Sequence, residues 1–331
     1  MGPKVSPWAT RLAVLTACAT WVLLLVGCLV HGTGSSLACP DWPLCYGSAF
    51  PKMENGVQYE HSHRLVATAV GLLTVTLAIV LHRRRAEDAT LAKMGYLGVG
   101  LVCFQGLLGG ITVILRLPIL ITLAHLCTSM AFFCLMTLVA LRTRETSETP
   151  PPAPDLAAFR PWVAATIAAT FGQILLGGTV RHTSSGLACF GIPLCNGELW
   201  PAHPGAHWHM SHRIFALVVA ALVIGLAVQL RRHAAGAGGA GGAAGAAGQA
   251  SRPAKLATLA LALVLVQITL GVLSVLSFLA LSAVTLHLGV AALLLACNVA
   301  IFYYLPSHAR ERGASSAVPE RGLRHARKQA A

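Results

Sequence analysis

The sequence predicts an all-α polytopic membrane protein whose eight transmembrane helices form two tandem four-helix bundles. Three observations predict this fold class. Hydrophobic residues make up 56% of the chain and charged residues only 11%, whereas a soluble domain carries about 25% charge. Eight apolar stretches are long enough to cross a bilayer. A pattern of cysteines and histidines also occurs twice in the same order, which indicates an internal duplication.

The eight apolar stretches are the predicted transmembrane helices. No small-residue cleavage site follows the first stretch, so we expect a retained span rather than a signal peptide. Arg116-Leu117-Pro118 predicts a turn between the third and fourth spans, and Leu276-Ser277-Phe278 is a weaker signal between the last two. The stretches lie at residues 12–31, 63–82, 94–115, 118–141, 161–180, 212–230, 256–275 and 278–304.

The duplication divides the chain into two halves. We expect a first four-helix bundle at residues 1–145, a Pro-rich linker at 146–160, a second bundle at 161–306 and a basic tail at 307–331. Each half contains an even number of spans, so the copies share one orientation and a pseudo-two-fold axis along the membrane normal. The Gly/Ala-rich stretch 234–250 is predicted to be a flexible inner loop of unassigned role.

The basic residues indicate the orientation in the membrane. The formal net charge is +13, but most of the basic residues lie in the tail and in the loops on the side of the two termini. This asymmetry predicts that both termini are cytoplasmic. It favours contact with anionic lipid by the tail, and it argues against nucleic acid as a partner.

Four histidines recur in the duplicated register and are candidate metal ligands. Gln105, Gly109 and His125 match Gln267, Gly271 and His287 at one constant offset, and His63 and His212 open the second and sixth spans. Ionisable residues in a membrane are costly and usually functional. Two imidazoles at the same depth on different helices can hold a haem between them. The alternative is a set of buried histidines that bond to neighbouring helices. Zinc is less suitable, because the thiolate and carboxylate partners of a closed zinc site are not placed with these helices.

The arginines that follow two of these histidines are candidate haem-propionate partners. Arg64 follows His63, and Arg213 follows His212. A guanidinium group can bind a carboxylate through two hydrogen bonds. The alternative is an arginine that extends to the lipid headgroups.

Two cysteine pairs lie in the long outer loops, at about residues 32–60 and 181–208. Cys39 and Cys45 bracket the first loop motif, and Cys189 and Cys195 bracket the second. The oxidising compartment and the short prolyl spacing predict one local disulfide in each loop. Both a stapling role and redox exchange with a partner remain open. Six other cysteines lie in apolar stretches and are expected to be packed thiols.

Glu60 breaks the symmetry of the two halves. It precedes His63 by three residues, whereas His209 occupies the matching place before His212. An acid beside only one of the two histidine pairs suggests that chemistry takes place in the first half. The alternative is an ordinary acid in the first turn of a helix. The sequence leaves further outer histidines unassigned, namely His31, His61, His182, His203, His207 and His209.

These residues together resemble the haem A synthase family, in its cysteine-bearing bacterial type. The resemblance covers almost the whole chain and rests on Glu60-x-x-His63, on His125, His212 and His287, and on the cysteine pairs. It implies oxidation of the methyl group of haem O to a formyl group, through a hydroxylated intermediate, to supply haem A to cytochrome oxidase.

The resemblance also implies roles for individual residues. His63 and His125 would flank the substrate haem O, with catalytic Glu60 near its reacting edge, and His212 and His287 would hold a low-spin haem b. Cys39 and Cys45 would be the functional cysteine pair. The protein would lie in the bacterial inner membrane and receive haem O from a haem O synthase. The electron acceptor and the formation of homo-oligomers are left to experiment.

Two other functions explain part of the pattern. A di-haem b electron-transfer subunit would use the four histidines but would need neither Glu60 nor the cysteines. A periplasm-facing thiol oxidoreductase would use the cysteines and leave the histidines without a role.

Overall fold

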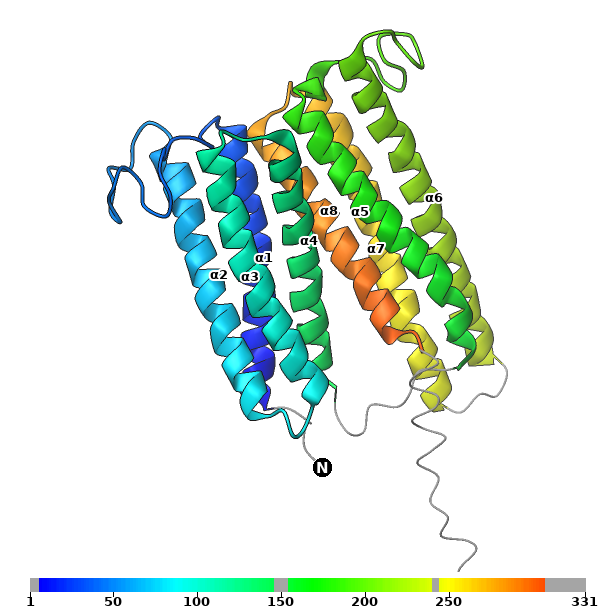
Figure 1. Ribbon diagram of the computed structural model, residues 1–331. Coiled ribbons are helices and arrows are strands. Elements are labelled where there is room, and N and C mark those ends of the chain that lie inside the picture. The colour runs from blue at the N-terminus through cyan, green and yellow to red at the C-terminus, as the bar shows by residue number, and fades with distance from the viewer. Residues whose placement is uncertain (1–5, 146–153, 240–243, 307–331) are drawn as a thin grey trace, which may run out of the picture.

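The computed structural model describes residues 6–145, 154–239 and 244–306. Within this part of the chain there are eight α-helices, two short 3₁₀ helices and no β-strand (Figure 1). All eight α-helices are long and apolar enough to cross a membrane, as predicted. The helices are α1 (Pro7–Gly32), α2 (Val57–Arg83), α3 (Ala89–Ile114), α4 (Ile119–Arg142), η1 (Pro154–Phe159), α5 (Arg160–His182), η2 (Ser185–Leu187), α6 (Pro204–Gly239), α7 (Ala244–Leu276) and α8 (Leu281–Tyr304).

The helices of each half pack around one another. In the first half each of α1 to α4 contacts its chain neighbours, and α1 also contacts α4. In the second half α5 to α8 repeat this arrangement, with α5 in contact with α8. The two groups stand next to each other in Figure 1. This packing agrees with the predicted pair of bundles, while the two-fold axis and the exact domain limits stay predictions.

Helix α8 forms most of the contact between the halves. It packs against α1 and α4 of the first half, and α4 also packs against α5. A seam of buried apolar residues joins the halves, among them Leu24, Phe133, Ile174 and Leu295. Because apolar surface that faces another helix is removed from lipid, α8 is the most buried of the spans.

The two predicted turns between spans are confirmed, including the weaker one. Arg116 and Leu117 separate α3 from α4 with φ angles of 57° and 63°. Phe278 and Leu279 separate α7 from α8 with φ angles of 54° and 65°. The same left-handed turn therefore ends the third helix of each half, as expected for a duplicated structure.

The second and sixth helices begin earlier than the apolar stretches predicted. Helix α2 starts at Val57 rather than at residue 63, and α6 starts at Pro204 rather than at residue 212. Hydropathy detects only the part of a helix in the hydrocarbon region, whereas backbone hydrogen bonding continues through the polar turns beneath the loops. Glu60 and His63 consequently lie on one helix, three residues apart.

The prediction of a flexible loop at residues 234–250 was wrong for most of that stretch. Helix α6 continues to Gly239, and α7 already begins at Ala244. Alanine is the strongest helix former, so the alanines of the stretch extend both helices. Residues 240–243, the linker prolines Pro150–Pro152 and the tail 307–331 lie outside the described residues.

Both long loops emerge at one end of the helices, which we call the outer end (Figure 1). At the opposite end, Asp88 caps α3 by accepting hydrogen bonds from the backbone N–H groups of Thr90 and Leu91, at 3.0 and 3.1 Å. Its carboxylate also pairs with Arg142 at the end of α4, at 2.9 Å. This ion pair ties the inner end of the α3–α4 hairpin together.

The orientation in the membrane leads to a testable prediction. Because basic residues cluster on the side of the termini, reporter fusions after residues 145 and 310 are both expected to report a cytoplasmic location. A fusion after Lys52 in the first long loop serves as the control and should report the outer compartment. An outer location for either of the first two fusions would contradict the topology.

Candidate functional site

Each of the four duplicated histidines lies against a glycine on the preceding helix. At each of these glycines an added Cβ atom would approach the Cε1 atom of the imidazole to between 2.9 and 3.4 Å. At the three shorter contacts the ring would have to shift, so glycine allows the imidazole to approach the helix closely, whereas the 3.4 Å contact at Gly109 is nearly an ordinary one. The pairs are Gly27 with His63, Gly109 with His125, Gly177 with His212, and Gly271 with His287.

In the second half the two imidazole rings lie close together in an edge-on arrangement. The ring centres of His212 on α6 and His287 on α8 are 6.3 Å apart, and the ring planes are inclined by 67°. Two imidazoles that share one metal atom, through metal–nitrogen bonds of about 2 Å, hold their ring centres roughly 6 Å apart. The second-half pair therefore fits bis-histidine coordination of one iron atom.

The buried imidazole nitrogens also fit a missing ligand. The Nδ1 atoms of His63, His125 and His287 are buried and have no hydrogen-bond partner among the described residues. A polar atom without a partner is costly in an apolar interior. Each of these rings therefore has a nitrogen free for a ligand, but Nδ1 of His61 and of His233 also lacks a partner, so the duplicated register is what singles out the candidate ligands.

Glutamine side chains hold the histidines, and more so in the second half. Gln105 donates to the backbone oxygen of His125 at 2.9 Å. Gln173 donates to the backbone oxygen of His212 at 2.9 Å and lies 3.0 Å from its Nδ1 atom. Gln267 lies 3.3 Å from Nε2 of His287. The internal repeat gives no signal for Gln173, because the alignment of Gly27 with Gly177 puts Leu23 at its place in the first half.

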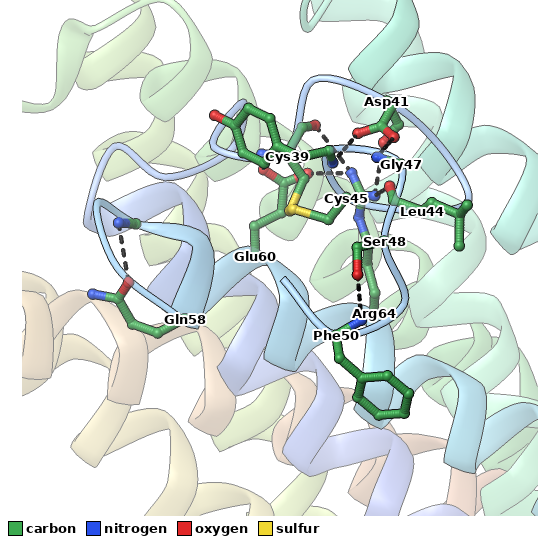
Figure 2. The surroundings of a disulfide bond; sticks show 12 residues. Cys39, Asp41, Leu44, Cys45, Gly47, Ser48, Phe50, Gln58, Glu60 and Arg64 are labelled. Atoms are coloured by element: carbon green, nitrogen blue, oxygen red, sulfur yellow. Dashed lines mark hydrogen bonds and ion pairs between the residues drawn. A yellow bond between two sulfur atoms is a disulfide. The ribbon is translucent and has the colours of Figure 1, made fainter. Parts of the chain in front are cut away.

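Glu60 is buried beneath the first cysteine loop and is only 4% exposed. Its Oε2 atom accepts a hydrogen bond from the backbone N–H of Cys39 at 2.8 Å, and its Oε1 atom accepts one from Arg64 at 2.6 Å (Figure 2). In the second half, His209 instead bonds to the backbone oxygen of Ser185 at 3.1 Å. The negative charge beside the helix-two histidine thus belongs to the first half.

The arginines next to the histidines support the loops. Arg64 donates to the backbone oxygens of Asp41 and Cys39, at 2.7 and 3.2 Å (Figure 2). Arg213 donates to the backbone oxygens of Cys189, at 2.7 Å, and Gly191. Because these guanidinium groups already bind loop carbonyls, their predicted contact with haem propionates stays a prediction.

Both predicted local disulfides are present. The sulfur atoms of Cys39 and Cys45 are 1.98 Å apart, and those of Cys189 and Cys195 are 1.97 Å apart. All four cysteines are fully buried. Thiol–disulfide exchange requires access of a thiolate to a sulfur atom, so the burial favours the stapling role.

Asp41 closes the turn inside the first disulfide loop. Its carboxylate accepts hydrogen bonds from the backbone N–H groups of Gly47, at 2.7 Å, and Tyr46, at 2.6 Å (Figure 2). These bonds, that of Gly47 first, lower the pKa of Asp41 below its ordinary value. The loop is therefore built around a carboxylate that stays charged at neutral pH.

The unassigned outer histidines have separate environments. His61 lies beside the first disulfide, with its ring and both sulfur atoms within 4.8 Å of one another, whereas Met210 takes the matching place in the second half. His207 stacks on Trp200 at 4.8 Å. Nδ1 of His203 accepts a hydrogen bond from the N–H of Gly205 at 3.1 Å. His31 and His182 lie next to each other across the two halves.

Comparison with known proteins gives consistent matches. The family model described as cytochrome oxidase assembly protein, COX15-CtaA, matches residues 54–299. That range contains Glu60, all four duplicated histidines and the second cysteine pair, while the first cysteine pair precedes it.

Several curated relatives carry the name heme A synthase. The relative from Shouchella clausii is 31% identical over 66% of this chain and 74% of its own length. The relative from Alkalihalophilus pseudofirmus is 30% identical over 65% of this chain and 74% of its own length. For that from Shewanella oneidensis the identity is 27%, over 67% and 78% respectively.

Proposed function

The chain belongs to the COX15-CtaA family of cytochrome oxidase assembly proteins, and on this premise we propose that it is a haem A synthase. The proposed reaction is oxidation of the methyl group of haem O to a formyl group through a hydroxylated intermediate. The enzyme is thus an oxidoreductase of the membrane, with haem O as its substrate.

The two histidine pairs match in position but differ in their neighbours, and this difference decides which half we assign to the substrate and which to a resident haem. The first half has the buried carboxylate of Glu60 one helical turn from His63. The second half has no acid at that place and holds both histidines with glutamines, Gln173 and Gln267. A substrate must enter and leave, whereas a resident group is best held by fixed ligands. We therefore assign haem O to His63 and His125, and a resident haem b to His212 and His287.

The residues of the second half would bind and orient the resident haem b. The close contacts with Gly177 and Gly271 and the nearby side chains of Gln173 and Gln267 restrict rotation of the two imidazoles. When bound there, haem b supplies a centre for electron transfer.

In the first half Glu60 is the proposed catalytic residue. Oxidation of a methyl group releases protons as well as electrons, and a carboxylate at the substrate edge can accept a proton or orient a water molecule. Arg64 and the N–H of Cys39 fix the position of the carboxylate. Such fixed orientation before the reaction is what electrostatic catalysis requires.

The two other functions are less well supported. A di-haem b electron-transfer subunit has no need for a buried acid at one histidine pair only. A thiol oxidoreductase needs a reachable disulfide, whereas the cysteines of both loops are fully buried. Neither function is suggested by the named relatives.

Extraction and chromatography of the haems in the purified protein test the proposal. We expect haem B together with haem O or haem A. In a host without haem O synthase, haem B alone should remain, because the substrate is absent while the resident site is filled. Haem B alone in a host that makes haem O would instead indicate the electron-transfer subunit, and a protein without haem would indicate the thiol oxidoreductase.

A further inference from the structure

Among the outer arginines of the described residues, Arg181 is the one with a buried guanidinium nitrogen that has no hydrogen-bond acceptor. The guanidinium groups of Arg64 and Arg213 bind loop carbonyls, and Arg116 is exposed on the turn between α3 and α4. Arg181, near the end of α5, is partly buried, and its Nε atom is buried with no hydrogen-bond acceptor among the described residues. No carboxylate of the described residues forms an ion pair with it. A buried cationic donor without an acceptor is costly, so this side chain is suited to an external anion.

Arg181 belongs to a group of donors at the seam between the halves. Its Nη2 atom would lie 3.2 Å from a Cβ atom at Gly32, so the guanidinium group reaches the last turn of α1. On the two helices that meet here, the rings of His31 and His182 have their centres 4.7 Å apart. The C-terminal dipoles of α1 and α5 favour a cation at this place, but they supply no acceptor for the Nε–H group. The group thus combines a guanidinium and two imidazoles without an anion.

The helical register puts these donors one turn outward of the glycines that contact His63 and His212. Gly177 is the glycine that contacts His212. Arg181 lies one helical turn after it on the same face of α5, a rise of about 6 Å toward the outer end. On α1, His31 follows Gly27, the glycine that contacts His63, by the same interval. The two propionates are the anionic groups of a haem, and a haem held by His212 and His287 with its propionate edge toward the outer end would bring them toward Arg181.

We propose that Arg181, together with the flanking His31 and His182, forms an anion site at the outer seam that binds a propionate carboxylate of the haem held by His212 and His287. This inference rests on the proposed function, because it requires haem b in the second half. Arg181 would then be a propionate partner beside Arg213, whose predicted propionate contact is untested.

Haem binding with and without free carboxylates tests the contact. Full-length protein from a haem-deficient host is titrated with haem b and with its dimethyl ester, in which both propionates are neutral. The wild-type protein should bind haem b roughly ten- to a hundredfold more tightly than the ester, as expected for loss of a charge-assisted hydrogen bond. Arg181→Gln should bind haem b about as weakly as the wild-type protein binds the ester, and should barely distinguish the two. Arg181→Lys, which keeps the charge, should recover part of the difference.

The matched control is Arg116→Gln, which removes an exposed arginine from the same end of the protein. It should behave as the wild-type protein does. The midpoint potential of haem b should also fall in Arg181→Gln and not in the control. The oxidised haem carries one more positive charge than the reduced haem, so loss of a nearby positive charge stabilises the oxidised form relative to the reduced form.

Other outcomes would overturn the inference. If Arg181→Gln still prefers haem b to the ester as strongly as the wild type, no propionate is bound there. If the variant loses copurified phospholipid instead, with unchanged haem binding, the anion is a lipid phosphate. A wild-type protein that binds neither haem would overturn the proposed resident haem b as well, and so separates the two failures.

Discussion

Replacement of His212 by alanine is expected to abolish the low-spin absorption spectrum of haem b. The variant lacks one of the two imidazoles whose ring centres lie 6.3 Å apart, and an iron without its second strong axial ligand does not keep a bis-histidine spectrum. The measurement is the reduced-minus-oxidised spectrum of the purified protein, with the haem quantified after extraction. His287→Ala should give the same result, because the two rings act as one site.

His207→Ala provides the matched control for this change. His207 lies on the same helix as His212, but its ring stacks on Trp200 in the outer region. Its loss should leave the spectrum of haem b intact. An unchanged spectrum in His212→Ala would contradict the pairing of His212 with His287 and, with it, the assignment of the second half.

Replacement of Glu60 by glutamine should stop the formation of haem A while leaving haem b in place. Glutamine is close to glutamate in shape but carries no charge, so it can neither accept a proton from the substrate nor stabilise positive charge at the haem edge. We expect the haem extracted from cells that express only this variant to contain haem O or the hydroxylated intermediate, with haem A reduced at least about a hundredfold.

The same substitution weakens the contact with Arg64. A loss of haem A through this structural effect must be distinguished from a loss through catalysis. Glu60 and Arg64 are both largely buried, with side chains 5% and 14% exposed, and loss of a charge-assisted hydrogen bond costs about 2 kcal/mol of stability. Retention of haem O, of the haem b spectrum and of the first disulfide would show that the loop is still folded. Normal haem A content would falsify the catalytic role and leave Glu60 as a structural acid of the disulfide loop.

In the disulfide loops, contacts between residues close in the sequence could be predicted, whereas contacts between distant residues could not. The spacing of the cysteines and the oxidising compartment were sufficient to predict both disulfides, since a disulfide closing so short a segment depends on local geometry. The same sequence could not reveal that Glu60 accepts from the N–H of Cys39, or that Arg64 binds loop carbonyls. Those contacts depend on how the loop folds back over the start of α2.

The amino-acid sequence by itself determined the membrane-spanning character, the number of spans, the duplication and the identity of the four histidines. These are properties of length, hydropathy and repetition, which can be read along one dimension because a span must be apolar over its whole length. The two wrong predictions of helix limits came from the same reliance on position along the chain. Hydropathy missed the polar first turns of α2 and α6, and the glycines of residues 234–250 concealed the helix-forming effect of their alanines.

Only the tertiary structure decided which side chains meet. Three kinds of contact join residues on different helices. They are the contacts of the histidines with Gly27 and Gly177, the contacts of Gln173 with His212, and the approach of Arg181 to the end of α1. In a membrane, helices associate mainly through close packing of small residues and through hydrogen bonds between helices, and these partners are chosen by rotation and depth rather than by position in the chain. For this reason the candidate ligands could be named from the sequence, whereas the residues that contact them could be identified only in the folded protein.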